Sequence, residues 1–213
     1  MKFILFVEGR TESKNVPSFL KRWLDVKLKY PIGLKPVRFG GWSELVNDMP
    51  KKALMYLNGP DREDIVGVIG LLDLYGPTFY PQNTITANDR IDWARNELER
   101  RVGDKCFRMF FAVHEVEAWL LSQPEVFPPK MSQALSRESK HPENVDFDTP
   151  PSRRLEILYR RETGREYKKT THGSQLFAKL DPEVAASKCP QLRCMLECML
   201  EMAENAGKKA EQL

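Results

Sequence analysis

The chain has 213 residues, of which 33 are lysine or arginine and 30 are aspartate or glutamate, so its formal net charge is +3. A charge this small neither argues for nucleic-acid binding by itself nor excludes it, because local patches decide. With 41% hydrophobic and 30% charged residues, the composition is that of a soluble globular protein, and no apolar run approaches the ~20 residues of a membrane span.

The first half of the chain alternates continuous apolar runs, which predict buried strands, with amphipathic segments, which predict helices. In chain order we expect a strand at 2–7, a helix at 12–29, a strand at 34–39, a helix at 42–57, a strand at 65–72, a helix at 89–102, a strand at 107–113 and a helix at 115–121. Pro50 implies a kink in the second helix or a break into two helices. The alternation predicts a parallel sheet with helices on both faces.

The character of the sequence changes after Pro124. The next residues are rich in proline, which indicates an ordered loop or a short linker rather than a further sheet, with prolines at 124, 128, 129, 142, 150 and 151. Helical patterns follow at 152–161, 174–180 and 191–204, and we expect the polar tail 207–213 to fray. We therefore predict an α/β core over residues 1–123 and, over residues 124–213, a Pro-rich connection and a helical segment packed on that core.

The cysteines and the start of the chain bear on location. Cys106, Cys189, Cys194 and Cys198 form no CxxC pair and no spacing typical of a zinc site. We interpret them as reduced thiols of a cytoplasmic protein. The sequence leads from Met1 straight into the first predicted strand, so we expect no signal peptide.

Acidic residues close three of the predicted strands. Glu8, Asp73 and Glu115 follow the first, third and fourth apolar runs, with Glu12 and Glu117 close by. A buried carboxylate loses hydration and needs a cation or donors in return, and ligands of open α/β sheets bind at the strand ends. Hard oxygen ligands suit Mg²⁺ or Mn²⁺, so we predict a metal site formed by these five acids. The alternative for any single acid, Glu12 above all, is that it complements a helix dipole.

Other polar residues are candidates for catalysis or for nucleic-acid contacts. His114 lies beside the predicted metal site and is either an acid or base or a structural histidine that fixes the strand end. Cations and hydroxyls that could hold phosphate follow in the second half, and the candidate nucleic-acid ligands are Arg153, Arg154, Lys168, Lys169 and His172. The alternative is a surface arginine pair and a solvated loop. Trp42, which follows two glycines, is the tryptophan that suits a ligand surface.

Several stretches carry a family resemblance. VEGRTE at 7–12 resembles the first motif of Toprim domains, as in topoisomerases, primases and OLD-type nucleases. The whole chain resembles a bacterial Toprim-like family, domain-of-unknown-function family 4276, through GGWSEL at 40–45, LLDLYGP at 71–77, HEVEAWLLS at 114–122, PPSRRLEILY at 150–159, THGSQLF at 171–177 and SKCPQL at 187–192. The resemblance implies a Toprim-type sheet and a place among proteins associated with phage defence, some paired with ATPase partners. It implies no established activity.

The second motif departs from the wider Toprim pattern, which is Asp, any residue, then Asp. Here Tyr75 stands where the second carboxylate is expected, after Asp73 and Leu74. A phenol with a pKa near 10 does not serve as a hard anionic ligand at neutral pH. Three alternatives follow: Glu115 or Glu117 replaces the missing charge, with Glu115 favoured; the site holds one metal; or catalysis is lost.

Two functions of different classes compete. The first is a Mg²⁺- or Mn²⁺-dependent phosphodiesterase, a nuclease acting on DNA or RNA, in which Glu8, Asp73 and Glu115 hold the ion. The second is a non-catalytic partner subunit that keeps the Toprim-like shell and binds an ATPase or a nucleic acid. The repeated acids at the strand ends favour the first function, whereas Tyr75 and the small net charge favour the second.

Overall fold

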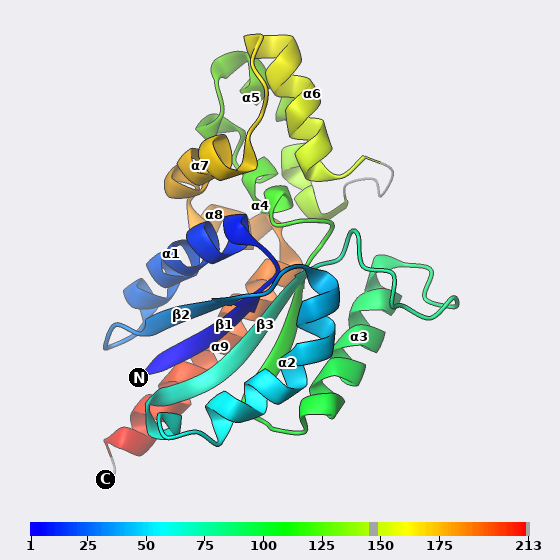
Figure 1. Cartoon of the computed structure of the whole chain (residues 1–213). Helices are drawn as coiled ribbons and strands as arrows, with labels where there is room; N and C mark the ends of the chain where they lie inside the picture. Colours follow the sequence, from blue (N-terminus) through cyan, green and yellow to red (C-terminus); the bar gives the residue numbers. More distant parts are fainter. Residues whose placement is uncertain (145–148, 212–213) are drawn as a thin grey trace.

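The computed structural model describes residues 1–144 and 149–211. The described residues form a 4-stranded parallel sheet (Figure 1). Its strands are β1 (Lys2–Val7), β2 (Gly33–Arg38), β3 (Ile65–Asp73) and β4 (Phe107–Ala112), in the order β2-β1-β3-β4. The two central strands are covered on both faces, which explains their continuous apolar sequences. Pro36 lies in the edge strand β2, where a missing N–H is tolerated. The predicted strands and fold class are confirmed.

Helices cover both faces of the sheet. Helices α1 (Arg10–Lys27) and α9 (Pro190–Ala210) lie on one face, and α2 (Trp42–Leu57) and α3 (Ala87–Val102) lie on the other (Figure 1). Side chains of β1 alternate between the two layers, because successive residues of a strand point to opposite faces. The sheet therefore has an apolar core on each face.

Gly67, in the middle of β3, allows α9 to approach the sheet closely. A Cβ at this position would collide with the Met202 side chain of α9 and would lie 2.8 Å from the Cys106 carbonyl oxygen. The absence of a side chain at this position is therefore a packing requirement.

The helices of the first half depart from the prediction in detail: α1 begins and ends two residues earlier than expected, and α3 begins two residues earlier. Helix α2 is continuous through Pro50, so the alternative of a break is wrong; its buried residues Leu45, Met49 and Ala53 keep one apolar stripe against the sheet. Helix α4 (Glu117–Leu121) begins two residues later than expected, because His114 adopts a left-handed φ of 66° and turns the chain before the helix starts.

The second half is more helical than the proline-rich sequence indicates. It contains α5 (Pro129–Leu135), α6 (Pro151–Thr163), α7 (Ser174–Lys179) and α8 (Pro182–Lys188), and α5 and α8 were not predicted. Helices α5, α6, α8 and α9 each begin with a proline, which is favoured at the first helical position because no N–H is needed there. Within the proline-rich stretch, Pro129 and Pro151 therefore start helices, and the prediction of a loop or linker was wrong for α5; the described residues of this stretch contain no strand, as expected.

The C-terminal helix is also longer than expected. Helix α9 continues to Ala210, so the prediction that it ends at residue 204 was wrong; residues 212–213 of the predicted tail lie outside the described part of the chain. The Glu211 carboxylate lies 2.8 Å from the Lys29 ammonium, which ties the end of α9 to the segment after α1.

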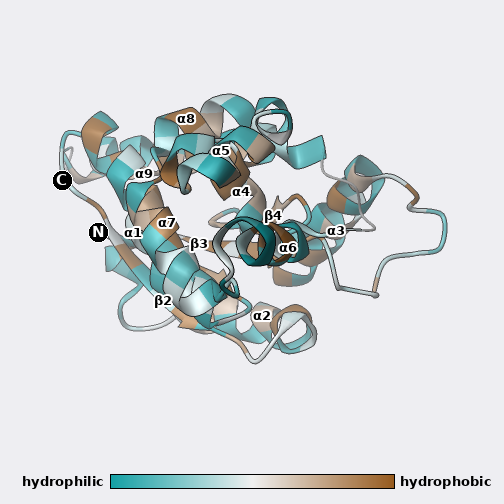
Figure 2. Cartoon of the chain, turned by 90° about the horizontal axis from the view of Figure 1, so that it is seen from above, coloured by the Kyte–Doolittle hydropathy of each residue, from teal (hydrophilic) through white to brown (hydrophobic). Residues whose placement is uncertain are grey.

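Helices α5, α6 and α7 form a lobe over the carboxyl ends of the strands (Figures 1 and 2). Buried side chains of this lobe belong to the same apolar cluster as those of β1, α1 and α9. The lobe therefore shares a core with the sheet and faces the rim where the predicted acids lie. Among the described residues, no helix combines the length and the apolar character that a bilayer crossing requires.

Candidate functional site

The strand-end acids Glu8 and Asp73 lie side by side at the carboxyl ends of the central strands. Glu8 follows β1 directly, and its Oε1 accepts a hydrogen bond of 3.0 Å from the Asp73 N–H. Asp73 ends β3, and its Oδ1 accepts a hydrogen bond of 3.1 Å from the Val116 N–H. The parallel register of β1 and β3 explains this meeting, because it brings both strand ends to one rim.

Glu115 is held by two elements of the C-terminal half. Its Oε2 accepts a hydrogen bond of 2.8 Å from the Ser152 N–H, and its Oε1 accepts one of 3.0 Å from the Ser152 hydroxyl. The Lys169 ammonium donates a further bond of 3.0 Å to Oε1. Ser152 lies in the first turn of α6, where unpaired N–H groups and the helix dipole favour a carboxylate.

Glu117 is fully buried at the start of α4, at 0% exposure. The Lys169 ammonium lies 3.4 Å from its Oε1, and both carboxylate oxygens have no hydrogen-bond partner. Lys169 therefore bridges Glu115 and Glu117 from the π-helical turn Lys169–Gly173. A buried carboxylate with only this one long ion pair is incompletely compensated.

The electrostatics show that the five acids act on one another. Burial raises the pKa of Glu8 to about 7; the Asp73 N–H opposes the shift, and the charges of Glu12 and Glu115 add to it. Burial also raises the pKa of Glu117 to about 7. The pKa of Asp73 is raised well above its ordinary value by burial and by Glu12, Glu8 and the other acids. The cluster therefore disfavours its own full ionisation.

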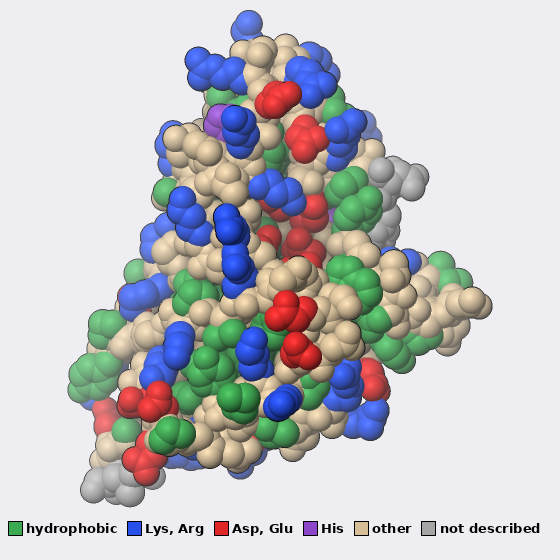
Figure 3. All heavy atoms as spheres, viewed as in Figure 1, with side chains coloured by type: hydrophobic (Ala, Val, Ile, Leu, Met, Phe, Trp, Pro, Cys, Tyr) green, Lys and Arg blue, Asp and Glu red, His purple; other side chains and the backbone are tan. Residues whose placement is uncertain are grey.

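Lys169 is the counterion of this cluster. Burial alone would lower the pKa of its ammonium, but the charges of Glu117, Glu115 and Asp73 outweigh burial and raise that pKa above its ordinary value. Figure 3 shows acidic side chains gathered where the lobe meets the rim of the sheet, with lysines and arginines around them. One ammonium does not balance five carboxylates, so the donor chemistry fits a further cation. In residues 1–144 and 149–211, however, no group of three or more acids, histidines or cysteines is arranged to hold a metal ion as it stands.

The other predicted site residues lie in three different environments. His114 is 1% exposed, and its backbone carbonyl accepts the Tyr75 N–H at 2.8 Å. The Arg153 guanidinium is exposed and pairs with Glu156 at 3.0 Å, while Arg154 on the same helix is half-buried. In the segment between α6 and α7, the Lys168 N–H donates to His172 Nδ1 at 3.0 Å, and the Lys168 side chain is exposed.

Two partners in the site escaped the sequence reasoning. Ser152 carried no signal beyond its place after two prolines, where a helix starts. Lys169 was predicted as a nucleic-acid ligand, whereas its ammonium lies among the acids.

Trp42 stacks on Phe79 with ring centroids 6.0 Å apart, so part of its surface belongs to an aromatic cluster beside the loop after β3.

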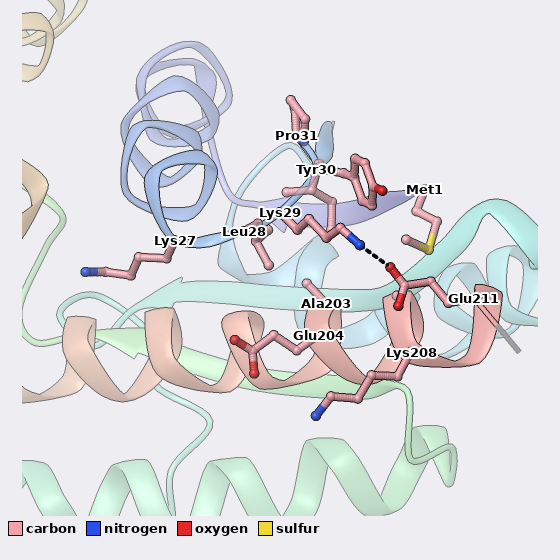
Figure 4. A pocket seen from close by; sticks show the side chains of 12 residues that line it. Met1, Lys27, Leu28, Lys29, Tyr30, Pro31, Ala203, Glu204, Lys208 and Glu211 are labelled. Carbon is pink, nitrogen blue, oxygen red and sulfur yellow. Dashed lines mark hydrogen bonds and ion pairs between the residues drawn. The ribbon is translucent and has the colours of Figure 1, made fainter.

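A groove of about 570 Å³ lies away from this site (Figure 4). Met1, Tyr30 and the end of α9 line it, so it lies at the amino end of the sheet, opposite the acids. No predicted site residue lines it.

Fold and site together define an α/β protein whose parallel sheet carries a buried acidic cluster at the carboxyl ends of its strands. The chain belongs to the family described as Domain of unknown function (DUF4276), whose match spans residues 7–200. The resemblance drawn from the sequence motifs is thereby confirmed.

Two solved structures align with nearly the whole chain, although their sequences are distant from it. The C-terminal region of the Xanthomonas campestris pv. campestris OLD protein is 19% identical, with 99% of this chain and 96% of that chain covered and a TM-score of 0.47. The C-terminal region of the Burkholderia pseudomallei OLD protein is 18% identical, with 96% of this chain and 98% of that chain covered and a TM-score of 0.47. No curated protein matches the sequence.

Proposed function

We propose that this protein is a divalent-metal-dependent phosphodiesterase that cleaves nucleic acid, DNA or RNA. The acids at the carboxyl ends of the strands support this proposal: Glu8 accepts the Asp73 N–H, Lys169 bridges Glu115 and Glu117, and burial with mutual repulsion raises the pKa of Glu8, Asp73 and Glu117. A cluster of this kind costs free energy unless a cation enters it. Hard cations held by carboxylates serve phosphoryl chemistry in particular.

The ion assigned to the site is Mg²⁺ or Mn²⁺, which prefer carboxylate oxygens and retain waters. We assign its binding to Glu8, Asp73 and Glu117, with Glu12 beside them. The two oxygens of Glu117 support this assignment, because they accept no hydrogen bond and Lys169 is 3.4 Å from Oε1. Since the acids are not arranged to hold an ion as they stand in the described residues, their side chains have to rotate when it binds.

Glu115 and Lys169 have a different role in this proposal. Both oxygens of Glu115 are already engaged by Ser152, and Oε1 also by Lys169, so we assign Glu115 to positioning the lysine. The Lys169 ammonium then donates to an oxygen of the scissile phosphate. A bound divalent ion neutralises phosphate charge and lowers the pKa of a bound water.

The remaining predicted residues complete the proposal. His114 is buried at the end of β4 and holds the Tyr75 backbone, so we assign it the structural role. Arg153, Arg154, Lys168 and His172 lie on the lobe above the acids and are proposed to contact the phosphate backbone.

The experiment that tests the function is cleavage of plasmid DNA and of RNA with Mn²⁺. Glu8→Gln and Asp73→Asn keep the side-chain shape and remove the charge, so we expect both variants to lose cleavage. Glu63→Gln, at the opposite end of β3 and exposed, is the matched control and keeps wild-type activity. Metal-dependent cleavage that persists in both Glu8→Gln and Asp73→Asn would place the chemistry elsewhere.

A non-catalytic binding subunit is the second candidate. Two observations favour it: a phenol at Tyr75 in place of the second Toprim acid, and acids that do not yet form a metal-binding group in the described residues. On this account the protein binds nucleic acid, and neither Mg²⁺ nor Mn²⁺ produces cleavage. The plasmid and RNA assays separate the two candidates.

An ATPase partner, a role in phage defence and a cytoplasmic location complete the proposal. The family resemblance supports the first two. The third is supported by the free cysteines of the described structure, which suit a reducing compartment. Cleavage assays with and without the products of neighbouring genes test the partnership.

A further inference from the structure

We propose that the loop after β3 forms a stacking platform for one unpaired nucleobase beside the acidic cluster, with the Tyr75 ring as its exposed face. This inference deepens the proposed function and rests on it for the class of substrate. It assigns a role to the residue that separates this sequence from the wider Toprim pattern.

The position of Tyr75 is fixed while its ring stays accessible. The residue lies two positions after Asp73, and its backbone N–H donates to the His114 carbonyl oxygen at 2.8 Å. The side chain is nonetheless 41% exposed. With its backbone fixed, a tyrosine has only two side-chain torsions to order, so its ring offers a flat apolar surface at a small entropic cost.

A cavity of about 700 Å³ adjoins this ring and is large enough for a nucleoside. Tyr75, Tyr80, Thr84 and Arg90 contribute to its walls. The Arg90 guanidinium carbon lies 5.3 Å from the centroid of the Tyr80 ring, and its Nε–H donates to the Thr84 carbonyl oxygen at 3.4 Å. The cavity thus combines aromatic faces with a positive charge, as sites for unpaired bases do.

Stacked aromatic rings support the wall of the cavity that Tyr80 forms. Tyr80 stacks on Phe79 at 4.5 Å between centroids, and Phe79 stacks in turn on Trp42. Burial raises the pKa of the Tyr80 hydroxyl, and the charges of Glu8 and Asp73 add to this effect. Tyr75 lines the cavity and follows Asp73 by two residues, so a base stacked on its ring would lie near the acids that are proposed to act on the phosphate.

Bases in an intact duplex are already stacked on their neighbours, so only an unpaired base gains from the platform. Stacking on an aromatic side chain is favourable for any base, because every base has a flat π-face. The platform thus predicts a preference for single-stranded segments, loops or frayed ends over intact duplex. It predicts no preference among the four bases.

Fluorescence anisotropy with the full-length chain tests this inference. The probes are labelled oligo(dT) and oligo(rU) single strands, a labelled duplex, and an abasic strand of equal length, all in a chelator so that nothing is cleaved. The variants are Tyr75→Leu, which removes the ring, and Tyr75→Phe, which keeps it. Tyr30→Leu is the matched control, because Tyr30 is another exposed tyrosine (60%) in the groove at the opposite end of the sheet (Figure 4).

We expect Tyr75→Leu to weaken single-strand binding about tenfold or more, and Tyr75→Phe to bind as the wild type does. Duplex and abasic binding should change little, and the salt dependence of single-strand binding should be unchanged, because no phosphate contact is removed. The inference is overturned if the wild type does not bind the single strands, if Tyr75→Leu weakens duplex and single strands equally, or if Tyr30→Leu has the same effect.

These outcomes are separable from a failure of the proposed function. Binding is measured without metal, so a Tyr75-dependent preference for single strands stands even where no cleavage is found. Conversely, cleavage that depends on Glu8 with no effect of Tyr75→Leu on binding keeps the function and overturns the platform.

Discussion

Lys169→Met should destabilise the protein because it leaves two buried acids without their counterion. The ammonium lies 3.0 Å from Glu115 and 3.4 Å from Glu117, whose side chains are 10% and 0% exposed. Methionine retains most of the aliphatic volume, so the substitution removes charge rather than packing. The lysine side chain itself is 38% exposed, and solvent therefore screens part of its interaction with the acids.

The expected loss follows from these burials. Removing one partner of a fully buried pair costs about 3–5 kcal/mol, and screening at the exposed lysine reduces this to about 2 kcal/mol at about pH 8. For a chain of this size, that corresponds to a fall in Tm of about 4–8 °C. The loss should shrink to about 1 kcal/mol at about pH 5, because Glu117, with a pKa raised to about 7, is then protonated.

Chemical denaturation in the presence of a chelator, at both pH values, measures this loss. Lys168→Met is the matched control, because the neighbouring lysine is exposed and its backbone N–H, not its ammonium, makes the bond to His172. We expect the control to retain wild-type stability within about 0.5 kcal/mol. An equal loss in the two variants, or a Lys169→Met loss that does not depend on pH, would refute the assignment of Lys169 as counterion.

Three further predictions follow from the site and the fold. Because the folded-state pKa of Glu117 lies above the ordinary 4.5, wild-type stability should fall as pH rises from about 4.5 to about 7. Denaturation curves of Glu117→Gln should lack about 3 kcal/mol of this dependence, and an unchanged dependence would contradict the burial of the charge. Tyr75→Asp should raise the affinity for Mn²⁺ in calorimetric titration, because it adds a carboxylate at the rim, and it should lower single-strand binding. Weaker Mn²⁺ binding by this variant would contradict the interpretation of position 75 as the second Toprim acid. Gly67→Ala should cost about 1–3 kcal/mol in denaturation experiments, because its Cβ would meet Met202 and the Cys106 carbonyl; wild-type stability would show that α9 shifts freely.

The sequence predicted the sheet well because the signal is local. Each strand of a buried parallel sheet is a continuous apolar run, and the helices between strands show apolar residues at helical spacing. The positions of Glu8 and Asp73 followed from the same pattern, since each directly closes such a run. What could be predicted was therefore the rim on which the acids lie.

The second half was harder to predict because its signals have two interpretations. Pro129 and Pro151 belong to the proline-rich stretch that indicates a loop, but each occupies the first position of a helix. The partners of Glu115 also lie outside local reach, since Ser152 is 37 residues away and Lys169 is 54 residues away. Such contacts depend on how the lobe packs over the sheet, which no local pattern encodes.

The central claim is that the acidic cluster binds a divalent cation and uses it on nucleic acid. Calorimetric titration of Mn²⁺ into wild type, Asp73→Asn and the control Glu63→Gln tests the cation binding most directly. The account predicts binding by wild type and Glu63→Gln and none by Asp73→Asn, with all three equally folded by circular dichroism. Equal Mn²⁺ binding by wild type and Asp73→Asn, or no binding by wild type, would contradict it.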